Sequence, residues 1–328
     1  MRRWAFRLAV LLILAAAGLL VAKQRIATPG PAAALTTVVV PKGTPTPEIG
    51  RLLKQAGVID QPWLFVLATR LGERRPLIAG EYAVPTAASI ADIVALMRKG
   101  TVVIHKLTIA EGLTVQQVAT LVNQADALTG TVAVPIEGSL LPETYYYTYG
   151  EDRAAVVGRM TKAMTQAVDA LWATHQPDSL PSGKAELVTL ASIVERETGI
   201  PEERPHVAAV FLNRLRLHMK LQSDPTVIYA LSHGAGFLDH PLSHADLAAD
   251  SPYNTYLAAG LPPGPICNPG KASLAAVMHP AISDDLYFVA DGTGGHVFAA
   301  SLAEHNKNVT RLRALEQAAR GAATNQTH

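Results

Sequence analysis

The sequence contains a single cysteine, Cys267, in 328 residues. One thiol excludes an intrachain disulfide framework and any zinc site built on several cysteines. None of the eleven histidines stands in an HExxH spacing, so the zinc-protease motif is absent as well. We interpret His240, His244, His279 and His305 as surface or hydrogen-bonded side chains, and we expect neither a metal ion nor a cofactor.

Positive and negative charges are nearly balanced. The formal net charge is +1, and no long block of like charge lies beyond the N-terminus, so nothing indicates a nucleic-acid-binding face. The segment GTGGH near residue 296 is not followed by GK[ST], so it is not a phosphate-binding P-loop. With 49% hydrophobic and 17% charged residues, the chain is long enough for two globular units. An uncharged partner such as a glycan fits this balance.

The N-terminus is a membrane-directed segment. Three arginines lie in residues 2–7, no charge occurs in residues 8–22, and Lys23 and Arg25 follow. The uncharged run is somewhat shorter than the roughly 20 residues that span a bilayer. We favour a retained anchor with its arginine-rich start inside and everything after Lys23 exported. The alternative is a cleaved signal peptide, for which the alanines of residues 15–17 offer a weak cleavage site.

Short strands and helices alternate in the first half of the chain. Residues 26–36 are rich in Pro, Gly and Ala and are typical of a linker. The stretch TTVVVPKGTPTPEIGRLLKQAGVI then predicts strand, turn and helix, and GEYAVP predicts a further strand. SIADIVALMRKG predicts a helix that begins after Ser89 and ends at Gly100.

The second half repeats the strand-turn-helix order and then becomes mainly helical. Alternating apolar residues predict a strand over 103–109, and a helix capped by Thr114 follows the turn. Helical periodicity covers residues 152–172, 184–197 and 205–216, and the remainder is rich in loops. The chain is therefore predicted to be α+β, with functional loops gathered in its C-terminal half.

The stretch LASIVERETG places two glutamates at the end of an almost wholly apolar helix. Glu195 lies above Ala191 and Ser192 on the helical wheel, whereas Glu197 shares the side of Glu186 and is predicted to be solvated. The negative end of the helix dipole disfavours a carboxylate there by about 0.3 to 1 kcal/mol, and apolar neighbours add to this. Glu195 is thus suited to hold a proton for a leaving oxygen. On residue chemistry alone, a solvated helix end is the favoured alternative.

Two later segments carry polar and aromatic groups of the kinds that bind sugars. A Pro-containing turn gathers Gln222, Ser223, Asp224 and Thr226, and such a cluster is costly to order unless it binds something. Tyr253, Asn254 and Tyr256 precede a stiff double-proline turn. The alternatives are that Asp224 with Pro225 only begins a turn, and that the tyrosines pack in the core.

These motifs together resemble the YceG-like family. The likeness rests on LASIVERET, LQSDPTVIYAL, YNTYLAAGLPPGPICNPG and LYFVADGTGGHVFAASLAEHN, and it runs in order from about residue 37 to residue 306. The resemblance implies a transmembrane anchor (1–25), a linker (26–36), a LysM-like subdomain (37–103) and a mixed α+β catalytic domain (104–328).

The resemblance also implies an activity, which is endolytic cleavage of the MurNAc–GlcNAc β-1,4 bond of nascent peptidoglycan with formation of 1,6-anhydroMurNAc ends. Glu195 would be the general acid and then the base, and no second carboxylate is needed because no water is consumed. EGSLLPETYYY resembles a family signature. The candidate substrate-binding residues are Glu143, Thr144, Tyr145, Ser192, Gln222, Asp224, Thr226, Tyr253, Asn254 and Tyr256.

The implied partners are peptidoglycan glycan strands, the inner membrane and peptidoglycan synthases, with no nucleic acid. The resemblance places the protein in the inner membrane as a single-pass protein with its catalytic domain in the periplasm. Two other functions stay open. One is a lysozyme-like hydrolase of the same substrate, in which Asp224 activates water, and the other is an inactive glycan-binding scaffold.

Overall fold

The computed structural model describes residues 2–71, 73, 75–177 and 179–325, so Met1 of the predicted anchor and residues 326–328 of the predicted catalytic domain lie outside the described residues. The chain forms two compact units. Unit 1 contains the described residues up to Lys106 together with Asp126–Thr129 and Tyr146–Asp152. Unit 2 contains Leu107–Ala125, Gly130–Tyr145 and the described residues from Arg153 onward. The predicted α+β class is confirmed.

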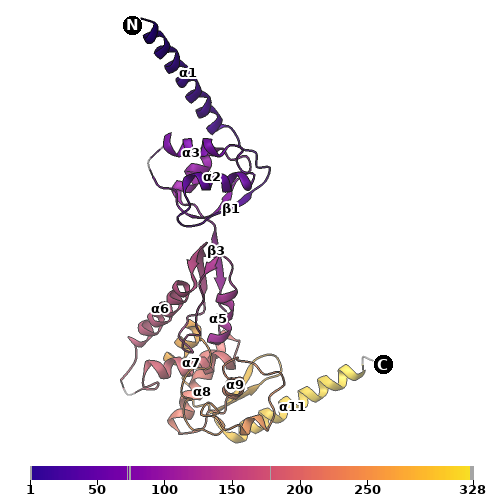
Figure 1. The fold of residues 1–328 in the computed structure, drawn as a ribbon. Helices are drawn as coiled ribbons and strands as arrows, with labels where there is room; N and C mark the ends of the chain where they lie inside the picture. Colours follow the sequence, from indigo (N-terminus) through magenta and orange to yellow (C-terminus); the bar gives the residue numbers. More distant parts are fainter. Residues whose placement is uncertain (1, 72, 74, 178, 326–328) are drawn as a thin grey trace. The chain divides into compact units, whose positions relative to one another are not determined.

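Helix α1 (Arg2–Ala27) opens unit 1, and its residues Phe6–Ala27 are long and apolar enough to cross a membrane. Most of its side chains are exposed, including large ones such as Leu12. Among the side chains of α1 that the structure describes, Ala22 and Ile26 at the C-terminal end are buried in the core of unit 1. Figure 1 shows α1 leading directly into the group of helices that contains α2 and α3.

A two-stranded antiparallel sheet and three helices complete the core of unit 1. The strands are β1 (Thr36–Val40) and β2 (Gly80–Val84), and the helices are α2 (Thr46–Gln55), α3 (Pro62–Leu71) and α4 (Ile90–Lys99). The predicted ends of α4 are confirmed. Ser89 and Asp92 form a reciprocal capping box at its start, and Gly100 adopts a left-handed φ of 69° at its end, which glycine tolerates best.

Short strands and one capped helix follow. Strand β3 (Ile104–Thr108) pairs with β5 (Thr144–Thr148), and β4 (Leu128–Thr129) runs parallel to β6 (Glu151–Asp152). Helix α5 (Val115–Gln124) begins with a capping box between Thr114 and Gln117, as predicted.

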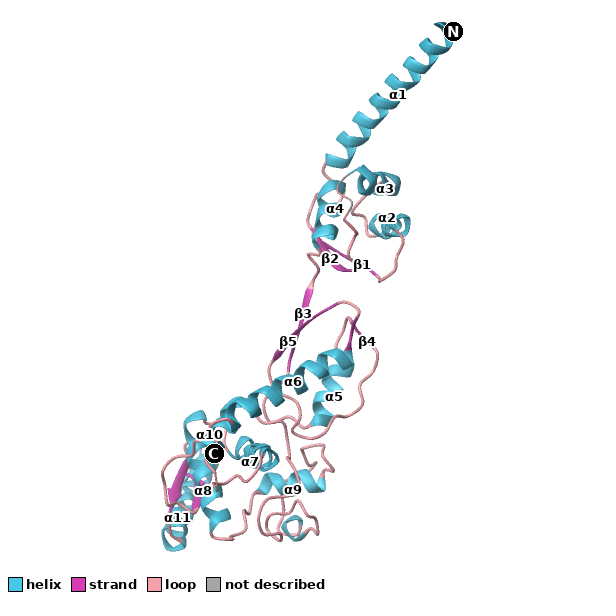
Figure 2. Cartoon of the chain, turned by 90° about the vertical axis from the view of Figure 1, so that its left-hand side faces the viewer, coloured by secondary structure: helices cyan, strands magenta, loops and turns pink. Residues whose placement is uncertain are grey.

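Unit 2 is built on a group of packed helices, which Figure 2 shows together with the strand pair beside them. Helices α7, α8 and α10 pack on one another, and α6 packs on α7 and α10. Their bounds, with those of the remaining elements, are α6 (Arg153–Trp172), α7 (Lys184–Glu197), α8 (Arg204–Arg216), α9 (Asp224–Leu231), α10 (Lys271–Met278), β7 (Tyr287–Ala290), β8 (His296–Ala299) and α11 (Leu302–Asn325).

The three long helical segments predicted from periodicity agree with α6, α7 and α8 to within one residue. One alternative is excluded: Asp224 with Pro225 does more than begin a turn, because helix α9 begins at Asp224. Pro225 occupies the first turn of this helix, where a missing backbone N–H costs nothing, and Asp224 places negative charge at the positive end of the helix.

Candidate active site

Helix α7 positions the two glutamates. Leu187, Leu190 and Ile193 are fully buried, which fixes the helix in the core of unit 2. The helix ends at Thr198, whose backbone is extended, and Pro201 lies just beyond. The last turn of α7 therefore lies at the edge of this core, and it contains both Glu195 and Glu197.

Glu195 is held by an ion pair and a backbone hydrogen bond. Its Oε1 lies 3.1 Å from Arg204 Nη2, and its Oε2 accepts a 2.8 Å hydrogen bond from the N–H of Gly270. The Glu195 side chain is only 4% exposed. Arg204 also reaches Glu111, at 3.4 Å. The expectation of apolar surroundings for this carboxyl group is corrected, because a guanidinium and a backbone N–H contact its two oxygens.

The loop before α10 is tied to α7 next to Glu195. The buried Ser192 hydroxyl accepts a hydrogen bond of 3.0 Å from the Ile266 N–H, and the Cys267 thiol donates to the Ser192 carbonyl. The Asn268 side chain accepts from the Leu140 N–H at 2.9 Å. On this side of the α7 end, hydrogen bonds therefore join the loop before α10 to α7 and to Leu140.

Glu197 lies in different surroundings. Its carboxyl group accepts a short hydrogen bond from the Ser223 hydroxyl and lines a cavity of about 440 Å³. Burial raises its pKa to about 7, and the nearby charge of Asp224 contributes in the same direction. The Ser223 hydrogen bond and the electrostatic effects of His296 and Arg214 oppose the rise. The prediction that Glu197 is solvated is therefore wrong.

Residues distant in the sequence line this cavity. They are Glu197, Arg214, Leu221, Gln222, Asp224, Tyr256, Tyr287, Phe288, Leu302, His305 and Asn306. The structure thus brings together three of the predicted residues, Gln222, Asp224 and Tyr256. The Tyr256 hydroxyl donates a 2.6 Å hydrogen bond to Asp224 Oδ1. Burial, followed by this hydrogen bond, raises the pKa of Tyr256, so its hydroxyl stays a donor.

Arginine and aromatic side chains from elsewhere in unit 2 add to the lining. Arg214 Nε donates to the Leu286 carbonyl at 2.6 Å, and its Nη1 donates to the Leu221 carbonyl at 2.8 Å. Its guanidinium carbon lies 5.2 Å from the ring centroid of Tyr287, and the His305 ring stacks on Tyr287. The cavity therefore offers a carboxyl group whose pKa is raised to about 7, a second carboxyl group, hydroxyl and amide groups, and aromatic side chains.

The model of the YceG-like family matches residues 38–311 of this sequence. The chain belongs to the YceG-like family. It is similar to an endolytic murein transglycosylase of Bacillus subtilis (strain 168), with 31% identity over 302 residues that cover 82% of this chain and 82% of the relative. The resemblance noted in the sequence motifs is confirmed.

Two further proteins extend this finding. An endolytic murein transglycosylase of Streptococcus pneumoniae serotype 2 (strain D39 / NCTC 7466) is 31% identical over 322 residues; the match covers 83% of this chain but 57% of that longer relative. The crystal structure of a YceG-like protein from Listeria monocytogenes matches with a TM-score of 0.52 and 31% identity, over 83% of this chain and 98% of that one.

The other predicted residues of this YceG-like chain lie outside the cavity lining. Thr226 and Asn254 are fully buried: the Thr226 hydroxyl donates to the Ser223 carbonyl, and the Asn254 amide donates to the carbonyls of Leu247 and Ala249. These bonds support the two loops that carry Asp224 and Tyr256. A further member of the predicted set, Tyr253, packs against Tyr229 at a centroid distance of 5.0 Å.

The motif residues of the segment EGSLLPETYYY lie at and beside strand β5. Glu143 pairs with Lys271 at 3.2 Å, and Thr144 shares a 3.0 Å hydrogen bond with Thr108. Tyr145 is buried and donates to the Leu141 carbonyl at 2.7 Å. None of the three predicted residues lines the cavity of about 440 Å³, and their contact with substrate stays a prediction.

The sequence motifs did not indicate Glu197, Arg214, Tyr287 and His305, which the structure places in the cavity lining. For Glu197 a signal was present, because Ile193 and Val194 lie four and three residues before it and therefore share its side of the helix. For the other three no local pattern separates them from ordinary core or surface residues. Across the part of the chain that the structure describes, no group of three or more His, Cys, Asp or Glu side chains is arranged to hold a metal ion.

Proposed function

We propose that this YceG-like chain is a membrane-anchored endolytic murein transglycosylase that cleaves the MurNAc–GlcNAc β-1,4 bond of peptidoglycan. Two relatives that match more than four fifths of the chain carry this name. The observation that carries the proposal is the Glu197 carboxyl group, whose pKa is raised to about 7 where it lines a cavity with hydroxyl, amide and aromatic groups. Such a group can give up a proton and take one back near neutral pH.

The reaction then needs one carboxyl group. Protonated Glu197 donates its proton to the glycosidic oxygen as the bond from that oxygen to C1 of the muramic acid breaks. The C6 hydroxyl of the same sugar attacks C1, and the Glu197 carboxylate takes the hydroxyl proton. A 1,6-anhydro ring forms, the released glycan keeps the first proton, and no water is consumed. Glu197 ends the cycle protonated, as it began.

Asp224 and the aromatic side chains support this chemistry. Positive charge develops at C1 while the glycosidic bond breaks, and the Asp224 carboxylate beside Glu197 stabilises it. The hydrogen bond from the Tyr256 hydroxyl holds that carboxylate in place. The ring of Tyr256 offers an apolar surface on which a sugar ring stacks.

The predicted acid, Glu195, stays a prediction. Its carboxylate is engaged by Arg204 and by the Gly270 N–H, and it does not line the cavity. Geometry therefore favours Glu197 as the acid and base, with Glu195 holding the loop before α10 against α7.

A second candidate function is a hydrolase of the same bond. It is favoured by one observation: Asp224 lies close enough to Glu197 to raise the pKa of that group, so two carboxyl groups share the cavity. In a hydrolase, one would protonate the leaving oxygen while the other activated water. An inactive glycan-binding scaffold is the third account.

The proposal includes the placement of the protein. Helix α1 would anchor it in the inner membrane with both units exported to the periplasm, as the arginines before the apolar run favour. Unit 1 has the order β1, α2, α3, β2, which supports the LysM-like interpretation. Peptidoglycan synthases that supply nascent strands would be its partners.

Product analysis tests the proposal. The detergent-purified full chain is incubated with isolated peptidoglycan, and the released fragments are identified by mass spectrometry for wild type, Glu197→Gln and Glu195→Gln. We expect 1,6-anhydroMurNAc ends from the wild type and from Glu195→Gln, and none from Glu197→Gln. Reducing ends would establish the hydrolase. Glycan binding without any release of fragments by the wild type would establish the scaffold.

A further inference from the structure

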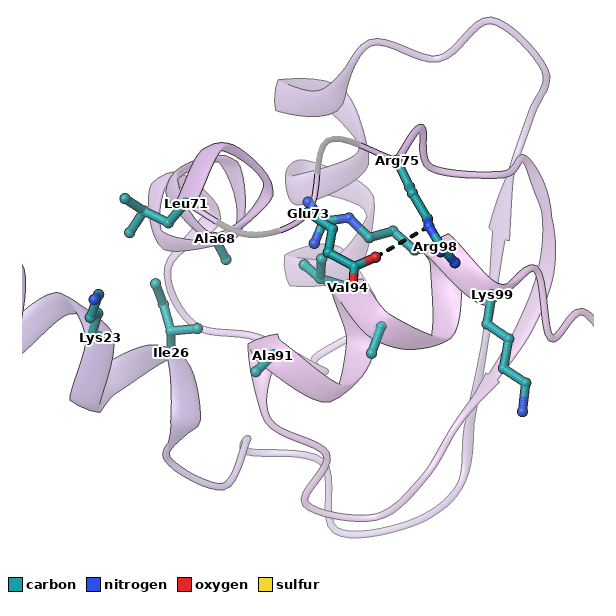
Figure 3. A pocket seen from close by; sticks show the side chains of 11 residues that line it. Lys23, Ile26, Ala68, Leu71, Glu73, Arg75, Ala91, Val94, Arg98 and Lys99 are labelled. Carbon is teal, nitrogen blue, oxygen red and sulfur yellow. Dashed lines mark ion pairs between the residues drawn. The ribbon is translucent and has the colours of Figure 1, made fainter.

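A second cavity lies in unit 1, beside the C-terminal end of helix α1, with a volume of about 600 Å³. Figure 3 shows the side chains that line it, which come from α1, α3, α4 and the segment between α3 and β2. They are Lys23, Ile26, Ala68, Leu71, Glu73, Arg75, Ala91, Val94, Ala95, Arg98 and Lys99. Neither the proposed reaction nor the glycan-binding residues use this cavity.

The lining combines an apolar wall with an excess of positive charge. Ile26, Leu71 and Val94 belong to the wall, together with three alanines. Four cationic side chains face one acidic side chain, Glu73, and Glu73 is paired with Arg75 at 3.2 Å. The charge of the lining is therefore +3 (four cations minus one carboxylate).

Arg98 contributes a donor that lacks an acceptor. Its Nη2 donates to the Thr69 carbonyl at 2.9 Å, which fixes the guanidinium at the cavity. Its Nε is buried, and among the described residues no acceptor bonds to it. A guanidinium with spare donors suits a phosphate group, whose oxygens match its fork of N–H groups.

The place of the cavity along α1 sets its depth in a membrane. The apolar segment Phe6–Ala27 has 22 residues, which at 1.5 Å per residue is about 33 Å, close to the thickness of the hydrocarbon core of a bilayer. Lys23 and Ile26 lie in the last turns of that segment, so the cavity lies where lipid headgroups begin.

From these observations we propose that the cavity binds one anionic phospholipid of the membrane that α1 enters. The phosphate of the headgroup lies at Arg75 and Arg98, which are neighbours in Figure 3, with the positive charge of Lys99 at the edge of the cavity. The first part of an acyl chain lies on the apolar wall beside Ile26 and Leu71. Basic pockets beside membrane helices bind acidic headgroups in this way. The inference rests on the anchoring role of α1 in the proposed function and is independent of the reaction.

Native mass spectrometry of the full chain in non-ionic detergent tests the site. Phosphatidylglycerol or phosphatidylcholine with the same acyl chains is added, and bound lipid is counted. The test variant is Arg75→Gln with Lys99→Gln. The control variant is Arg51→Gln with Lys54→Gln, which removes the same two charges from exposed positions of α2. Arg51 pairs with Glu48 as Arg75 pairs with Glu73, so the two variants are closely matched.

We expect the wild type and the control variant to retain phosphatidylglycerol in preference to phosphatidylcholine, and the test variant to lose roughly tenfold in phosphatidylglycerol affinity, since each basic group near a lipid phosphate adds a few-fold. Equal retention of the two lipids, or an equal loss in both variants, would overturn the proposal. Displacement of the lipid by millimolar inorganic phosphate would identify a free-phosphate site instead.

Flotation of the full chain with vesicles of pure phosphatidylcholine separates a failure of the anchor from a failure of the site. If the chain does not float, α1 is not an anchor and the lipid proposal fails with it, whereas the release of peptidoglycan fragments still reports on the reaction. If it floats and the preference for phosphatidylglycerol is absent, only the lipid site fails.

Discussion

The carboxyl groups of Glu195 and Glu197, at the C-terminal end of α7, have different surroundings. On one side, Glu195 meets Arg204 and a backbone N–H, and the surrounding loops close over it. On the other side, Glu197 meets a hydroxyl group and a second carboxylate beside a cavity. The ion pair and the N–H hold Glu195 in the structure, whereas burial and the charge of Asp224 raise the pKa of Glu197 to about 7, where it can exchange a proton. Two residues of helix separate these roles.

The strongest test of this contrast is activity. Glu197→Gln removes the proton donor, and because general acid–base catalysis contributes about 100-fold to 10,000-fold, we expect a loss of that size. Glu195→Gln should keep activity within about tenfold, since its contribution is positional. The rate of release of 1,6-anhydro fragments measures both. The reverse pattern would restore Glu195 as the acid, and unchanged thermal unfolding of the inactive variant shows that the fold is intact.

Stability should depend more on the ion pair of Glu195 than on Glu197. Arg204→Gln leaves the Glu195 carboxylate buried without its cation, so we expect a loss of about 3 kcal/mol in the free energy of unfolding of unit 2. Glu197→Gln should cost less than about 1 kcal/mol, because a neutral amide replaces a group that is already neutral below pH 7. Urea titration of each full-length variant measures the difference. A larger loss in Glu197→Gln than in Arg204→Gln would contradict the contrast.

The pH dependence of activity sharpens the interpretation of Glu197. The reaction begins with the protonated acid, so activity should fall as the pH rises through about 7, the value to which burial and Asp224 raise the pKa of Glu197. Asp224→Asn removes a like charge that disfavours ionisation, so the pKa of Glu197 should fall and the alkaline decline should move to lower pH, by up to about one unit. Rates measured for the wild type and Asp224→Asn between about pH 5 and pH 9 would show this shift. The interval covers about two units on either side of that pKa. A shift to higher pH would mean that another group sets the decline.

The smallest effect is expected at Glu143, which does not line the cavity that contains Glu197. Its ion pair with Lys271 is exposed, with 52% and 61% of the two side chains accessible. Exposed pairs contribute about 0 to 1 kcal/mol, so Glu143→Gln should change the unfolding free energy by less than about 0.5 kcal/mol. If the variant nevertheless weakens glycan binding severalfold in a pull-down with insoluble peptidoglycan, Glu143 contacts the substrate as the family motif implies. Lys271→Gln serves as the matched control.

Local signals in the sequence predicted several elements well. Ser89 and Gly100 mark the ends of α4, Thr114 caps α5, and the apolar periodicity of residues 184–197 coincides with α7. These features depend on neighbours within one or two turns, which the sequence displays directly. The start of α9 at Asp224 was missed because a Pro-containing polar cluster is compatible with both a turn and the first turn of a helix.

The sequence by itself determined the family, the α+β class, the apolar N-terminal helix and the presence of two glutamates at a helix end. The tertiary structure alone decided which glutamate is paired and which faces a cavity. Arg204 lies nine residues from Glu195, Asp224 lies 27 residues from Glu197, and Tyr287 is further away still. The state of a buried carboxyl group depends on the charges and the solvent within a few ångströms of it, and folding brings those partners together from distant parts of the chain.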